Sequence, residues 1–149
     1  MRLIMANRLE TQSNWFSASF LEELQELVHP VGMKDWNAGL VIVDNQEIKR
    51  LNSQFRDKKS VTDVLSFSHL VLDFDDTAVI IKKGNNYAAD DLYLDKAEDE
   101  VGEIIIAPEF VSDRCVENSW DVFDELAMLV VHGALHLLGW DHQTEYQTK

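Results

Sequence analysis

The sequence contains very little cysteine and no long uninterrupted hydrophobic run. Cys115 is the single cysteine among 149 residues, so neither an internal disulfide nor a zinc site built on several thiolates is available. No stretch reaches the roughly 18 apolar residues that a membrane-spanning helix needs. No charged segment leads into an apolar one in the manner of a secretory signal. We therefore expect a protein of the reducing cytoplasm that does not enter a membrane.

Basic residues are also scarce. Lys and Arg total 13 against 27 Asp and Glu, which gives a formal net charge of −14 at pH 7. Through its bulk charge, a chain this acidic repels nucleic acid and anionic membranes. Hydrophobic residues still make up 46% of the chain, enough at this length for one domain with its own core. The composition taken alone therefore argues against an RNA partner.

The chain alternates between segments with the periodicity of helices and short apolar runs of strand length. Helices are predicted at 16–28, at 44–55 behind a capping Asp44, after Pro108, and from Asp121 to Gly139. Strands are predicted at 39–43, at 61–72 as one long strand or a bent pair, and at 103–107. These elements predict an α+β fold, with a small mixed sheet of about four strands and helices packed on it.

An acidic segment separates the second and third predicted strands. Residues 73–100 carry nine acidic side chains against three lysines, and they include the turn-forming sequence Gly84, Asn85 and Asn86. We interpret this segment as an insertion within a single domain that spans residues 1–149, with a hairpin arm at 78–81.

Three of the five histidines fall within the string HGALHLLGWDH, at His132, His136 and His142. Four residues turn an α-helix by about 400°, so the first two rings project about 40° apart and about 6 Å along the axis. Gly139 ends the helix and lets the chain return the third imidazole to the same point. Unpaired imidazoles in so apolar a helix are costly to desolvate, so we predict that the three bind one metal ion. Three ligands and an open position are typical of catalytic zinc.

The spacing HxxxHxxGxxH is shared with the metzincin proteases, which place a glutamate after the first histidine as general base. Gly133 stands at that position here. Glycine cannot take a proton from bound water, so peptide hydrolysis by that route is disfavoured. A metal can instead act as a Lewis acid on a substrate whose nucleophile comes from elsewhere, and RNA with its 2′-hydroxyl is such a substrate. A metalloprotease-like zinc hydrolase stays as the alternative.

The histidine string resembles the signature of the YbeY family of metal-dependent endoribonucleases and ribosomal RNA maturation factors. A second stretch, LNSQFRDKKSVTDVLSF at 51–67, is similar to the family motif in which an Asn and an Arg precede a Thr-Asp-Val-Leu-Ser-Phe strand. A third, VGEIIIAPE, resembles the family's Gly-Asp strand that leads into a helix. The resemblance covers roughly residues 20–143.

The resemblance implies a zinc-dependent, single-strand-specific endoribonuclease that matures small-subunit ribosomal RNA and serves ribosome quality control. It implies a zincin-like central histidine helix and one zinc ion per chain on His132, His136 and His142, with nickel as an alternative metal. Arg56 matches the arginine of the family's active-site cleft. The implied partners are single-stranded or ribosomal RNA, together with small-subunit ribosomal proteins or assembly factors.

The side chains at these positions have the chemistry that an RNA-cleaving site needs. A guanidinium such as that of Arg56 can hold the scissile phosphate bidentately and stabilise the charge of the transition state. Asn52 and Ser66 are candidates for the lining of the same cleft. Asp141 is a candidate for orienting His142, since carboxylates often accept a hydrogen bond from metal-bound histidines.

The sequence departs from the family pattern in a few places. Val61 and Ser68 stand where the family usually has proline on either side of TDVLSF, and Glu103 replaces the Asp of the Gly-Asp pair. Relatives also continue into a C-terminal helix beyond the position of Lys149. A further alternative is a ribosome-assembly factor that does not cleave RNA and whose metal only holds the fold together.

The positive charge is unevenly distributed. Five of the 13 basic residues fall within eleven positions around the candidate arginine: Lys49, Arg50, Arg56, Lys58 and Lys59. We therefore predict a local basic edge that meets RNA on an otherwise acidic protein.

Overall fold

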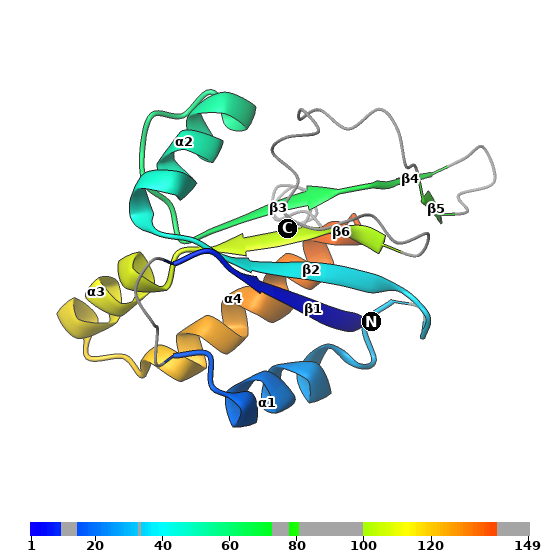
Figure 1. Cartoon of the computed structure of the whole chain (residues 1–149), viewed down its shortest axis with the longest axis horizontal. Coiled ribbons are helices and arrows are strands. Elements are labelled where there is room, and N and C mark those ends of the chain that lie inside the picture. The colour runs from blue at the N-terminus through cyan, green and yellow to red at the C-terminus, as the bar shows by residue number, and fades with distance from the viewer. Residues whose placement is uncertain (10–14, 33, 73–77, 81–99, 140–149) are drawn as a thin grey trace, which may run out of the picture.

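A computed structural model describes residues 1–9, 15–32, 34–72, 78–80 and 100–139 of the chain. A four-stranded sheet carries helices on both faces, with a two-stranded ribbon beside it (Figure 1). The strands are β1 (Arg2–Asn7), β2 (Asn37–Ile42), β3 (Val64–Ser68), β4 (Leu70–Leu72), β5 (Ala78–Ile80) and β6 (Glu100–Ile106). The helices are α1 (Ala18–Val28), α2 (Asn45–Arg56), α3 (Pro108–Asn118) and α4 (Val122–Leu137). The predicted α+β fold with a four-stranded mixed sheet is confirmed.

The strand order in the main sheet is β1-β2-β6-β3. β2 pairs in parallel with β1 and with β6, whereas β3 pairs antiparallel with β6 and forms one edge of the sheet. The run at 61–72 is a bent pair, β3 and β4, and β4 pairs with β5 as the predicted hairpin arm. The rest of the predicted acidic insertion, at 73–77 and 81–99, lies outside the described residues.

β1 is a strand that the sequence pattern did not predict. It forms the other edge of the sheet, and its residues are exposed or half-buried, without the regular alternation of apolar and polar residues that marks a strand. The strand is held instead by the backbone ladder to β2 and by α1. Gln25 accepts a hydrogen bond from Leu3 N at 2.9 Å and donates one to the Met1 carbonyl at 2.9 Å.

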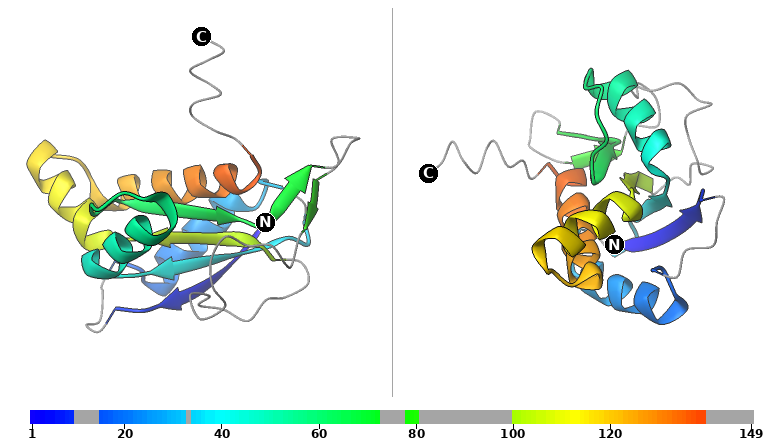
Figure 2. Two further views of the ribbon diagram at one scale, coloured as in Figure 1. Left: turned by 90° about the horizontal axis from the view of Figure 1, so that it is seen from above. Right: turned by 90° about the vertical axis from the view of Figure 1, so that its left-hand side faces the viewer.

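Successive residues of the central strands face two separate cores. Leu40 and Ile104 pack with α1, α3 and α4, while Val41 and Ile105 pack with α2. Figure 2 shows α2 on one side of the sheet and α1 and α4 on the other. Because both faces are covered, these strands are buried at almost every position rather than at alternate ones.

The two predicted capping residues begin their helices as expected. Asp44 Oδ1 accepts from Glu47 N at 2.8 Å at the start of α2, and Asp121 Oδ1 accepts from Asp124 N at 3.0 Å at the start of α4. Among the described residues, no helix is both long enough and apolar enough to cross a membrane.

Gly102 of β6 marks the tightest packing in the sheet. Its φ is +155°, and a Cβ at this position would lie 2.3 Å from the Phe67 carbonyl oxygen of β3 and 2.7 Å from Leu137 Cδ2 of α4. The glycine of the GEI motif therefore lets the strand β3 and the end of α4 approach the same point of β6.

We predict that Gly102→Ala destabilises the fold by about 3 kcal/mol or more, because it combines overpacking with an unfavourable φ. Urea unfolding followed by tryptophan fluorescence measures this loss. Gly139→Ala is the matched control, since Gly139 also has a positive φ, +94°, but has open space around its Cβ position. It should lose only about 1–2 kcal/mol. Equal losses would show that the close approach at Gly102 carries no cost.

Candidate active site

Helix α4 buries one apolar stripe in the core and leaves two histidines at its edge. Leu126, Val130 and Leu137 are fully buried, while His132 and His136 are half-buried. The four-residue spacing brings the two rings together as predicted. Their Nε2 atoms lie 2.8 Å apart and their ring centroids 4.4 Å apart.

The two Nε2 atoms fit the donor set of a zinc site. Zinc binds imidazole nitrogen at about 2.0–2.1 Å with tetrahedral angles, which places two ligand nitrogens about 3.3 Å apart. The observed 2.8 Å therefore requires the rings to open by only about half an ångström. His142 and Asp141 lie outside the described residues, and within the described part of the chain no three metal-ligating side chains come together. The structure thus places two of the three predicted ligands.

Two serines of β3 hold α4 in register with the strand. Ser68 Oγ donates to the Leu137 carbonyl at 2.7 Å, and Ser66 Oγ donates to the Gly133 carbonyl at 3.4 Å. Two residues of a strand and four residues of a helix both advance by about 6 to 7 Å, so the contacts repeat along the two elements. Ser68, which replaces a proline of the family pattern, thus satisfies a carbonyl at the C-terminal end of the histidine helix.

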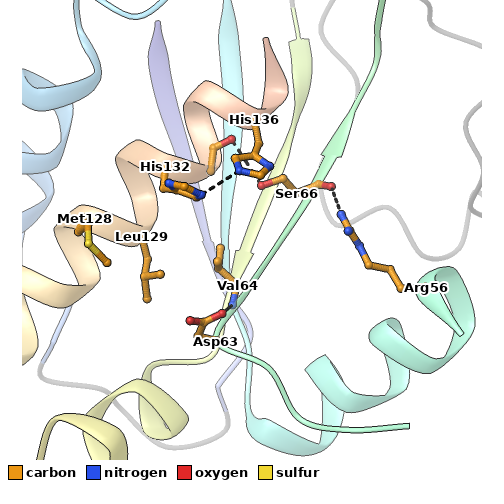
Figure 3. A pocket seen from close by; sticks show the side chains of 9 residues that line it. Arg56, Asp63, Val64, Ser66, Met128, Leu129, His132 and His136 are labelled. Atoms are coloured by element: carbon orange, nitrogen blue, oxygen red, sulfur yellow. Dashed lines mark hydrogen bonds between the residues drawn. The ribbon is translucent and has the colours of Figure 1, made fainter. Parts of the chain in front are cut away.

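Arg56 reaches the same strand from the opposite side. It is the last residue of α2, and its Nη2 donates to the Ser66 carbonyl at 3.1 Å (Figure 3). Ser66 therefore lies between the guanidinium and the two histidines, and the structure brings together Arg56, Ser66, His132 and His136.

Asn52 holds the loop that follows Arg56 through hydrogen bonds to its backbone. Its side chain is 3% exposed and donates to the Ser60 carbonyl at 3.0 Å, and its own carbonyl accepts from Lys58 N at 3.2 Å. Asn52 is absent from the pocket lining. The predicted cleft residue thus acts on the site through the loop, because its amide is used to hold the backbone.

Arg56, Ser66 and the two histidines line a pocket of about 420 Å³. Its lining comes from α2, from β3 and the residue before it, and from α4: Arg56, Asp63, Val64, Ser66, Met128, Leu129, His132, Gly133 and His136. Four lining residues were not predicted from the sequence: Asp63, Val64, Met128 and Leu129. Met128 could have been found, because it precedes His132 by four residues and so lies on the same side of the helix.

Comparisons with known proteins agree with this arrangement. The sequence model of the family described as "Endoribonuclease YbeY" matches residues 5–149. The chain belongs to the YbeY family. A Clostridium botulinum protein named Endoribonuclease YbeY is 34% identical over 111 residues, which are 74% of this chain and 66% of that protein. A Nostoc protein of the same name is 32% identical over 135 residues, 91% of this chain and 64% of the relative. The matches thus span just under two thirds of these relatives.

A solved structure supports the fold. The solution structure of a Thermotoga maritima protein aligns with a TM-score of 0.54 and 26% identity, over 94% of this chain and 74% of the other. The fold of this YbeY-family chain therefore has an experimental counterpart.

Asp63 closes one end of the pocket and connects it to two helices. Its Oδ1 accepts from Val64 N at 2.7 Å and from Thr62 Oγ1 at 3.3 Å, and its Oδ2 lies 2.8 Å from Arg114 Nη1 of α3. Arg114 Nη2 in turn lies 3.4 Å from Glu125 Oε2 of α4. The Thr-Asp pair of the family motif thus fixes the start of β3.

Two other conspicuous residues lie apart from the pocket. Glu103, where the family has Asp, is buried in β6 and does not line the pocket. Cys115 is buried in α3, and burial, aided by the nearby Glu125, raises the pKa of its thiol. The buried thiol lies outside the pocket, so it is not placed to act as a nucleophile in this site.

Gly133 packs directly against the sheet. A Cβ at this position would lie 2.8 Å from Ile104 Cγ2 and 3.2 Å from Ser66 Oγ. The position at which metzincin proteases carry their catalytic glutamate thus has no room for a side chain in this YbeY-family protein.

We predict that Gly133→Ala destabilises the protein by about 1–3 kcal/mol through overpacking. Helix propensity alone predicts the opposite sign, since Ala is favoured over Gly by about 1 kcal/mol inside a helix. The sign of the change in the urea-unfolding free energy therefore decides between them. A stabilised variant would contradict the close packing of α4.

Proposed function

We propose that this protein is a zinc-dependent endoribonuclease that cleaves single-stranded RNA. The observation that carries the proposal is the convergence of Arg56 from α2 with the paired Nε2 atoms of His132 and His136 from α4 in one pocket. Membership of the YbeY family and relatives named Endoribonuclease YbeY support the endoribonuclease part of the proposal.

Arg56 binds the scissile phosphate. A guanidinium has five N–H donors, and the Ser66 carbonyl accepts one hydrogen bond from it, so the others can reach a ligand. Two parallel N–H···O bonds to a phosphate orient the reacting group. Because the negative charge on the phosphate oxygens increases in the transition state, the guanidinium stabilises that state more than the ground state.

His132 and His136 would hold the zinc ion together with His142, which the family resemblance adds as third ligand. A bound zinc ion supplies Lewis-acid polarisation of a phosphoryl oxygen or a water of lowered pKa. The chain's own part is to present neutral Nε2 atoms at a fixed separation. The packing of Gly133 and the hydrogen bond of Ser68 keep the helix that carries them in place.

The basic edge around Arg56 explains how an acidic protein meets RNA. Lys49, Arg50, Lys58 and Lys59 are all exposed, on α2 or on the loop that Asn52 holds. Phosphate groups are attracted to this edge and repelled by the rest of the surface. Binding of free RNA is therefore weak and strongly dependent on salt.

We base a proposal for the cellular role on the resemblance of the sequence motifs to the YbeY family. We infer that the protein matures small-subunit ribosomal RNA and serves ribosome quality control in the cytoplasm, with small-subunit ribosomal proteins or assembly factors as partners. The metalloprotease-like alternative has no base at Gly133. The non-catalytic assembly-factor alternative is separated by the experiments below.

We predict that Arg56→Ala lowers kcat/KM for cleavage of a single-stranded RNA oligonucleotide by at least about 100-fold, because it removes a charged donor to the transition state. Zinc content and melting temperature should stay unchanged, since Arg56 is exposed and its one observed bond is to a backbone carbonyl. Gel analysis of end-labelled RNA measures the cleavage.

Arg50→Ala is the control for this experiment. Arg50 lies on the same helix, pairs with Glu47 and Gln54, and does not line the pocket. Because Arg50 belongs to the basic edge and not to the pocket lining, its removal should weaken RNA binding and so raise KM about threefold, whereas kcat should change by less than about threefold. Undiminished cleavage by Arg56→Ala would remove Arg56 from the mechanism, and the absence of cleavage by the zinc-loaded wild type would favour the assembly factor.

We predict that His132→Ala and His136→Ala each lower the zinc content of protein purified without chelator from about one ion per chain to near zero. Elemental analysis measures the metal. Zinc should raise the melting temperature of the wild type and not of the variants, because only a bound ligand stabilises the native state. Affinity should also fall as the pH drops through about 6.5, since protonated imidazole cannot bind metal. A wild type that folds without binding zinc or nickel would contradict the site.

A further inference from the structure

The pocket has an apolar half that phosphodiester cleavage does not require. Val64, Met128 and Leu129 line it, and Figure 3 shows these side chains across the pocket from Arg56. Leu129 is 6% exposed and belongs to the core, whereas Met128 is 53% exposed. An exposed methionine at the rim of a pocket offers a polarizable apolar surface that adapts to a ligand.

The size of the pocket also exceeds what a phosphate group needs. Its volume of about 420 Å³ falls in the range of about 300–1,000 Å³ found for small-molecule sites. Arg56, Ser66 and the histidines occupy one part of the lining. The remaining part can take a flat apolar group attached to the phosphate.

Asp63 lies at the end of this apolar half. A carboxylate offers about four acceptor positions, and Val64 N, Thr62 Oγ1 and Arg114 Nη1 use three of them. Among the described residues, no hydrogen bond uses the fourth position, and Asp63 lines the pocket, so a donor bound there can use it. The exocyclic amino group of a nucleobase is such a donor, and carboxylates recognise cytosine N4 in this way.

We propose that the apolar half of the pocket binds the nucleobase next to the scissile phosphate. The base lies against Met128 and Leu129, its amino group donates to Asp63, and its phosphate reaches Arg56. The proposal rests on the proposed RNA cleavage and adds a substrate preference to it. A base can enter only when it is unpaired, so the subsite explains specificity for single strands, and bases with an amino group are preferred to uracil.

Nucleotide binding tests the subsite without any cleavage. In protein labelled with 13C at the methionine methyl groups, cytidine 5′-monophosphate should shift the Met128 methyl resonance. Met5 on β1, which is 38% exposed, serves as an internal reference that should not move. Ribose 5-phosphate keeps the phosphate and lacks the base, so it should leave Met128 unshifted. Equal shifts with both compounds, or none with either, would overturn the proposal.

Uridine 5′-monophosphate tests the part assigned to Asp63. Its base carries a carbonyl where cytosine carries the amino group, so it should bind at least about threefold more weakly in the same titration. Equal affinity would overturn the assignment of Asp63.

Kinetics test the subsite on RNA. Met128→Ala should raise KM for a single-stranded oligonucleotide about tenfold, the effect expected from the loss of one buried apolar contact, while kcat changes less than threefold. Met128→Leu should restore KM because it restores the apolar volume. Met5→Ala, a matched removal of an exposed methionine on β1, should change neither constant.

The two proposals fail in different ways. If cytidine 5′-monophosphate shifts Met128 while no RNA is cleaved, the base subsite stands and the endoribonuclease proposal fails. If RNA is cleaved while Met128→Ala leaves KM unchanged and no nucleotide shifts its methyl resonance, the subsite is overturned and the endoribonuclease stands.

Discussion

The close packing of α4 against the sheet is the constraint on which the candidate site depends. At Gly133, the backbone of α4 packs against Ile104 with no side chain between them. At Gly102, the backbone of β6 packs in the same way against Leu137 at the end of the helix. Ser66 and Ser68 then tie the helix carbonyls to β3. Because protein interiors are close-packed and yield little, this arrangement fixes where the ring nitrogens of the histidines lie relative to the strand. The site is therefore a consequence of how closely a helix can approach an edge strand.

The surface of the protein is acidic on average but carries one local basic stretch near the site. The net charge is −14, yet the groups that would meet a phosphate lie on one short stretch from α2 to the following loop. The buried residue Asn52 holds the backbone of this loop through hydrogen bonds, so a neutral residue positions the backbone that carries Lys58 and Lys59. An exposed cation attracts a polyanion over about a Debye length, roughly 8 Å at physiological salt, which keeps the attraction local to this edge.

The sequence predicted the parts of the site that depend on local periodicity. The meeting of His132 and His136 follows from the 3.6-residue period, and the helix starts at Asp44 and Asp121 follow from their capping chemistry. β1 was missed because an edge strand held by backbone pairing carries no apolar alternation. The contact between Asp63 and Arg114 joins positions 51 residues apart, and no local pattern encodes it. The role of Asn52 was unforeseen for a related reason, since its partners are backbone atoms of a loop. His142 and Asp141 stay predictions, because they lie outside the described residues.

Two ion pairs, from Asp63 to Arg114 and from Arg114 to Glu125, join three elements at the end of the pocket that Asp63 closes. The carboxylate belongs to the entry of β3, the guanidinium to α3 and the second carboxylate to α4. Arg114 shares its charge between two partly buried acids, so removing it would leave both carboxylates uncompensated at the pocket end. The histidines at the other end of α4 belong to the same helix as Glu125. The 16-residue helix α4 therefore connects the end of the pocket that Asp63 closes, through Arg114 and Glu125, to the end that the histidines line.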